Sequence, residues 1–136
     1  MKNMEKGMEC EDFIAENIRE KGLYVEQNYT WGIDIVIKTL LGDIQVEVKS
    51  AQMCVKNGLR GVRKGNFSFI PDNLDRPDYF AFVITNDLNK KTTYWVAGDV
   101  IREHFKNRKR NSAFTMGIPT LKTRIEKVDF SEVIKL

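Results

Sequence analysis

Near the N-terminus, apolar residues recur at the spacing of an α-helix, with charged residues between them. The apolar set consists of Met8, Phe13, Ile14 and Ile18. Acidic residues are concentrated in the first turns, and Arg19 and Lys21 lie in the last, which is the arrangement that the helix dipole favours. The pattern predicts a helix over residues 8–21 that ends at Gly22.

The next part of the chain alternates apolar and polar residues, which is typical of β-strands. Residues 23–29 predict a first strand, residues 33–38 a second and residues 44–49 a third. The short segment from Leu41 to Asp43 predicts a turn that joins the last two strands. We therefore expect a hairpin or a meander in this part of the chain.

Residues 51–65 break the alternation, because they contain several glycines and four basic residues without an acid. We interpret them as a mobile basic loop. After this loop the pattern predicts, in order, a short strand at 66–70, a strand buried on both faces at 79–85, a strand at 92–97, a helix at about 99–107 with Asp99 as its N-cap, and one more strand within 118–136.

Length and composition are those of a single ordinary domain, residues 1–136, with 42% hydrophobic residues and a formal net charge of +3. The order of the elements predicts an α/β (α+β) fold with a central mixed sheet flanked by helices. The longest apolar run, Tyr79–Ile84, is too short to span a membrane, and no signal peptide is evident. Two widely separated cysteines favour reduced thiols in a cytoplasmic protein.

Three acids and a lysine are distributed over the first predicted elements. Glu11 lies in the helix, Asp34 in one strand, and Glu47 and Lys49 in the next. Since residues two apart on a strand point the same way, Glu47 and Lys49 share one face. Asp34 joins them if its strand pairs alongside, and Glu11 approaches if the helix packs over the sheet. Carboxylates gathered in this way suit Mg²⁺, with Mn²⁺ as a substitute, and need no histidine.

The ordered set resembles the PD-(D/E)xK nuclease superfamily. The segment from Lys6-Gly7 through Glu11 to Lys21-Gly22-Leu23 is similar to the start of archaeal-type Holliday junction resolvases. Gly32-Ile33-Asp34 resembles the family's Pro-Asp strand, with Ile33 in place of proline, and Val46 to Ser50 resembles its Glu-x-Lys-Ser strand. Beyond Ser50 the pattern is closer to restriction-type or homing-type members.

The resemblance implies a restriction-endonuclease-like core and a role for each residue. Asp34 and Glu47 would bind the metal together with the Val48 carbonyl, and Glu11 would be an outer or second-metal ligand. Lys49 would serve the attacking water, and Gln52 would orient that water or the scissile phosphate. The alternative for Glu47 and Lys49 is a solvated strand face without catalysis.

Two basic clusters without acids are candidates for phosphate contacts, because a carboxylate site repels DNA unless cations flank it. The alternative is an ordinary solvated surface. The first cluster follows the predicted active strand, and the second follows the predicted second helix. They comprise Lys56, Arg60, Arg63 and Lys64, and then Lys106, Arg108, Lys109 and Arg110.

The sequence thus predicts a Mg²⁺-dependent DNA endonuclease, structure-selective and acting on branched DNA in preference to linear duplex. The alternatives are a site-specific restriction- or homing-type endonuclease, and a non-catalytic DNA-binding protein on a degenerate nuclease fold. Because one site can cut one strand at a time, we also expect a homodimer.

Overall fold

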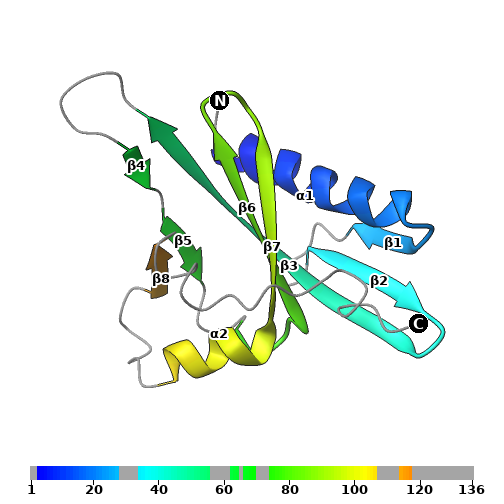
Figure 1. Ribbon diagram of the computed structural model, residues 1–136. Coiled ribbons are helices and arrows are strands. Elements are labelled where there is room, and N and C mark those ends of the chain that lie inside the picture. The colour runs from blue at the N-terminus through cyan, green and yellow to red at the C-terminus, as the bar shows by residue number, and fades with distance from the viewer. Residues whose placement is uncertain are drawn as a thin grey trace.

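A computed structural model describes residues 3–27, 34–55, 62–64, 66–69, 74–106 and 114–117. Its elements follow one another along the chain as labelled in Figure 1. They are α1 (Asn3–Glu20), β1 (Tyr24–Gln27), β2 (Ile35–Thr39), β3 (Gly42–Val55), β4 (Val62–Lys64), β5 (Asn66–Phe69), β6 (Tyr79–Asn86), β7 (Lys91–Ala97), α2 (Gly98–Phe105) and β8 (Phe114–Gly117).

The main sheet has the strand order β1-β2-β3-β6-β7, and β4 pairs with the end of β3. The β3–β6 pair is parallel, and the other pairs are antiparallel, so the sheet is mixed. Strands β5 and β8 form a separate antiparallel pair. The expected α+β fold with a central mixed sheet and flanking helices is therefore confirmed.

The sheet is covered on both faces (Figure 1). Helix α1 packs on one face, where Ile14 and Ile18 meet Ile35, Ile37 and Val46. The β5 strand and α2 pack on the other face over a cluster rich in aromatic side chains. That cluster contains Phe67, Phe69, Phe80, Phe82 and Phe105.

Strand β6 confirms the prediction of a strand buried on both faces. Phe80 and Phe82 point into the aromatic cluster, while Ala81 and Val83 point toward α1. Because neighbouring strands lie on both sides of it and covering layers on both faces, β6 needs an unbroken apolar run.

Three expectations about elements were wrong. Helix α1 begins at Asn3 rather than at residue 8. Strand β3 continues to Val55, and β4 lies within the segment predicted as a loop. Hydrogen bonding to β6 and β4 stabilises the extended backbone of this part of β3, although its sequence does not alternate between apolar and polar residues. Helix α2 begins at Gly98 without a side-chain cap, and Asp99 instead pairs with Arg102. The strand expected within 118–136 lies outside the described residues.

In the part of the chain that the structure describes, no helix is both long enough and apolar enough to cross a membrane.

The end of α1 provides a first test of the fold. Gly22 has φ of +82°, and its N–H donates to the Arg19 carbonyl at 2.9 Å, as in a left-handed helix cap. A Cβ added there meets nothing within 4 Å. We therefore expect Gly22→Ala to lower the free energy of unfolding by about 1 kcal/mol through backbone strain alone. Gly22→Asn should cost less, since Asn tolerates this conformation. Urea denaturation measures both, and equal stability of Gly22→Ala and wild type would contradict the cap.

Candidate active site

Strand β3 changes its neighbour along one edge. Its pairing with β2 ends where Val46 meets Ile35, and its pairing with β4 begins only at Met53. Asp34, which directly precedes β2, reaches into the interval between these two neighbours. Its carboxylate accepts the Val48 backbone N–H at 2.8 Å. Because the N–H and C=O of one strand residue project from the same edge, the Val48 carbonyl faces the same side as this carboxylate.

Glu47 and Lys49 lie together on the face of β3 that is turned away from α1. The Lys49 ammonium is 3.3 Å from a Glu47 carboxylate oxygen, and the two side chains are only 14% and 10% exposed. Lys49 also interacts electrostatically with Asp34. The structure thus brings Asp34, Glu47 and Lys49 to one part of β3.

Glu11 reaches this place from the opposite layer. It projects from α1, which covers the other face of the sheet, and its carboxyl group is hydrogen-bonded to that of Asp34. Burial, followed by the charge of Asp34, raises the pKa of Glu11 to about 8. Burial therefore favours a proton held between the Glu11 and Asp34 carboxyl groups at neutral pH.

The other two acids also have raised pKa values, and burial is the main cause for each. For Asp34, burial outweighs the Val48 N–H, the Glu11 hydrogen bond and Lys49, which all lower its pKa. For Glu47, burial and the charge of Asp34 outweigh the opposing effect of Lys49. The free protein therefore holds three acids in an environment where their combined negative charge is unfavourable.

The side chains at this place offer carboxylate oxygens, which are the ligands that a hard divalent cation prefers. Within the described ranges, no group of three or more histidine, cysteine or acidic side chains is arranged to enclose a metal ion. Mg²⁺ does not require such a group, because it keeps several waters and commonly binds through one or two carboxylates. Asp34 and Glu47 supply oxygen donors, and a cation there would offset the unfavourable burial of their negative charge, which is the main cause of their raised pKa values.

Gln52 is not brought to Lys49. The two residues are three apart on the continuous strand β3, so their side chains leave opposite faces, and Gln52 is exposed. Its expected role in orienting water or phosphate therefore has no support from its placement.

Most of the predicted phosphate-binding residues cannot be placed. Lys56, Arg60, Arg108, Lys109 and Arg110 lie outside the described residues. Of Arg63 and Lys64 the structure describes the backbone, as part of β4. Lys106 is exposed at the end of α2 and pairs with Glu103.

One contact of the site was not predicted from the sequence. The Lys49 ammonium lies 5.2 Å from the centroid of the Phe69 ring. Phe69 belongs to the short apolar strand β5, and nothing in that segment distinguishes it from an ordinary core residue.

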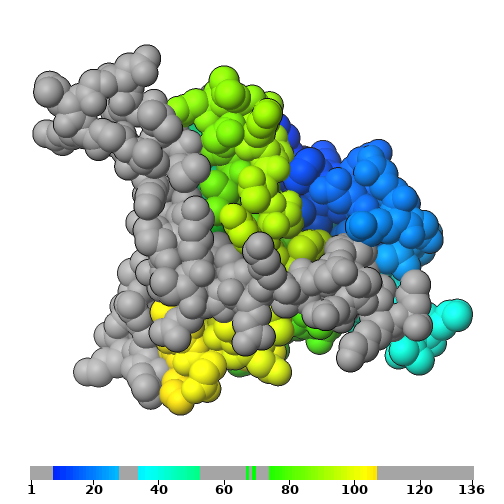
Figure 2. All heavy atoms as spheres, in the orientation of Figure 1, coloured from blue at the N-terminus to red at the C-terminus, as the bar shows by residue number. Residues whose placement is uncertain are grey.

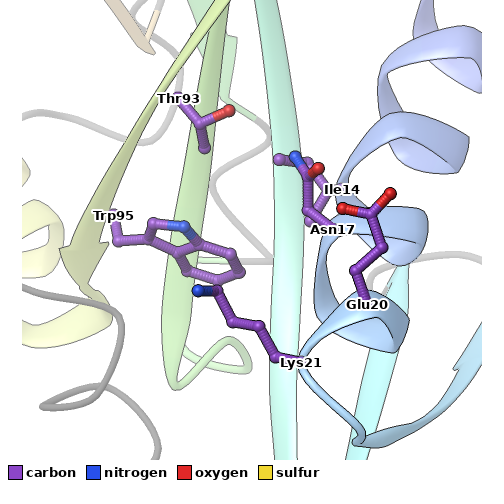
Figure 3. A pocket seen from close by; sticks show the side chains of 6 residues that line it. All are labelled: Ile14, Asn17, Glu20, Lys21, Thr93 and Trp95. Atoms are coloured by element: carbon purple, nitrogen blue, oxygen red, sulfur yellow. The ribbon is translucent and has the colours of Figure 1, made fainter.

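A separate pocket of about 450 Å³ lies between α1 and the edge strand β7. Figure 2 shows these two elements, blue and green, side by side on the surface, and Figure 3 shows the lining side chains. Strands β3 and β6 separate β7 from β2, so the pocket is distinct from the acidic site. It is lined by Ile14, Asn17, Glu20, Lys21, Thr93 and Trp95.

Comparison with known proteins gives a match in structure alone. No family model and no curated protein sequence matches the chain. The chain is similar to the solved structure of a bacterial homing endonuclease, I-Ssp6803I, with a TM-score of 0.58 and 15% sequence identity. The similarity covers 86% of this chain and 75% of that one. The protein therefore shares its fold with an endonuclease.

The raised pKa of Glu11 predicts a pH-dependent cost to stability. An acid whose pKa rises from 4.5 when unfolded to about 8 when folded favours the folded state at low pH, and this contribution is lost as pH rises between those values. We expect Glu11→Gln to raise the free energy of unfolding at pH 8 by about 1 kcal/mol, a figure reduced for solvent screening of a partly exposed group. At pH 4 the gain should disappear.

Urea denaturation in EDTA at both pH values measures this effect. Glu16→Gln is the matched control, because Glu16 is exposed on the same helix. A Glu11→Gln variant whose stability relative to wild type is the same at both pH values would contradict the assignment.

Proposed function

We propose that the protein is a Mg²⁺-dependent DNA endonuclease that hydrolyses phosphodiester bonds. The observation that carries this proposal is the convergence of Glu11, Asp34, Glu47 and Lys49 where β3 changes its neighbour. Their order along the chain is that of the PD-(D/E)xK nucleases, to which we assign the protein. The fold shared with a homing endonuclease is consistent with this assignment.

In this proposal Asp34 and Glu47 would hold the metal, with the Val48 carbonyl as a further oxygen donor. When bound, Mg²⁺ would polarise a phosphoryl oxygen and lower the pKa of a bound water. The Val48 N–H fixes the orientation of the Asp34 carboxylate. Glu11, whose carboxyl group lies against that of Asp34, would serve as an outer ligand of the metal.

Lys49 is the proposed partner of the attacking water and of the phosphate. Its ammonium is confined beside Glu47, with little exposure to solvent. From there it can orient the water and stabilise the negative charge that develops on the phosphate in the transition state. The basic residues after β3 and α2 would offset the repulsion between the acids and the DNA backbone.

Two substrate classes compete within this function. Recognition of branched DNA requires mainly phosphate contacts, which the two basic clusters would supply. Site-specific cleavage of duplex DNA is the second candidate, and the structural similarity to a homing endonuclease favours it.

A cleavage assay on labelled DNA would test the function. The substrates are a four-way junction, a flap, a duplex and a single strand, and each is incubated with Mg²⁺, Mn²⁺ or EDTA at two salt concentrations. We expect metal-dependent cuts in branched DNA and a steep loss of binding with salt. Cuts at one fixed sequence in linear duplex would instead establish the site-specific alternative. If the protein binds DNA but cleaves no substrate with either metal ion, the alternative of a non-catalytic DNA-binding protein would be correct.

We further propose that the active form is a homodimer, because cutting both strands of a duplex or junction requires two sites. Light scattering with and without DNA should detect the dimer. A monomer under all conditions, including at saturating DNA, would limit the protein to nicking or to single-stranded substrates.

A further inference from the structure

The Lys49 ammonium contacts the aromatic ring of Phe69 as well as the carboxylate of Glu47. Its ammonium is 5.2 Å from the centroid of Phe69 and 3.3 Å from Glu47. An ammonium over the face of an aromatic ring is attracted by the ring's negative quadrupole, and the attraction strengthens where water is excluded. With its side chain 14% exposed, Lys49 is in such an environment.

Phe69 itself is rigidly placed. Its ring lies 5.0 Å from that of Phe105 on α2 and 5.6 Å from that of Phe80 on β6, centroid to centroid, and the residue is 6% exposed. Strand β5, which carries Phe69, is paired with β8. The ring therefore belongs to the layer that covers this face of the sheet.

We infer that Phe69 is a positioning residue, whose ring face holds the Lys49 ammonium in the place from which it serves the water and the phosphate. The inference rests on the proposed function and adds to it. A lysine has four rotatable bonds, and without the Phe69 ring only the contact with Glu47 would keep its ammonium from turning toward solvent. The two contacts together restrict it to one region beside β3.

The test replaces Phe69 with 3,4,5-trifluorophenylalanine by nonsense suppression. Fluorine withdraws electron density from the ring face while leaving its shape almost unchanged, so packing is preserved. We expect the single-turnover rate of metal-dependent cleavage to fall about fivefold, with unchanged DNA affinity. A monofluorinated ring should give an intermediate rate.

The matched control is the same replacement at Phe67. That residue is fully buried in the same strand, and its ring packs edge-on against Phe82 at 4.8 Å. We expect no change in rate there. An equal rate loss at both positions, or none at Phe69, would overturn the inference.

A second measurement does not depend on activity. In the NMR spectrum of protein with ¹³C-labelled lysine, the Lys49 CεH₂ signal should be shifted upfield by the ring current of Phe69. The shift should vanish in Phe69→Leu and persist in Phe67→Leu, with Lys49→Met identifying the signal. An unshifted signal in wild type would refute the positioning even if the protein cleaves DNA. A wild type that cleaves nothing but has the shifted signal would refute the proposed function and leave the contact intact.

Discussion

Replacing either proposed metal ligand by its amide is expected to abolish cleavage, with a loss of at least about 10³-fold in the single-turnover rate. Asp34→Asn removes one charged oxygen but keeps an oxygen that can accept the Val48 N–H, so the local fold should survive. Glu47→Gln keeps the shape of a side chain that is 10% exposed. DNA binding should persist or tighten, since each change removes negative charge that faces the phosphates.

Gel-based cleavage assays and binding in EDTA measure these effects separately. The control is Asp43→Asn, which removes the same charge from an exposed acid that pairs with Lys38 at the far end of the β2–β3 hairpin. Mg²⁺ should raise the melting temperature of wild type and of Asp43→Asn but not that of Asp34→Asn. Wild-type cleavage by Asp34→Asn or Glu47→Gln would refute the assignment of the metal ligands.

The second large effect is expected at Lys49. Lys49→Met keeps most of the aliphatic side chain and removes the ammonium, which should lower the single-turnover rate by about 10²- to 10³-fold. The metal ligands remain, so the Mg²⁺-induced rise in melting temperature should persist. This combination separates loss of the catalytic cation from loss of the metal.

Lys38→Met is the control for loss of a positive charge. Lys38 lies on β2, 37% exposed, and pairs with Glu26 and Asp43 away from the site. We expect it to cleave DNA at nearly the wild-type rate. If both lysine variants lose activity equally, the effect would come from general attraction of DNA rather than from Lys49 at the reacting phosphate.

The local sequence patterns predicted most of the regular elements. Helical spacing around Ile14 and Ile18, alternation in β2 and the continuous apolar run of β6 each reflect a periodic burial requirement that the sequence records directly. The same alternation placed Glu47 and Lys49 on one face. The boundaries were less accurate, because β3 extends to Val55 through pairing with partners distant in sequence.

The sequence by itself predicted the type of fold and the set of candidate site residues. Only the tertiary structure decided how that set is assembled. Glu11 comes from the layer opposite Lys49 and meets Asp34 where β2 begins. Phe69 supplies a ring face from a strand more than a dozen residues further along the chain. Such contacts depend on strand order and on the packing of layers, which bring together residues that no local periodicity connects. The burial they produce also raises the pKa values of all three acids, an effect that residue identity alone does not contain.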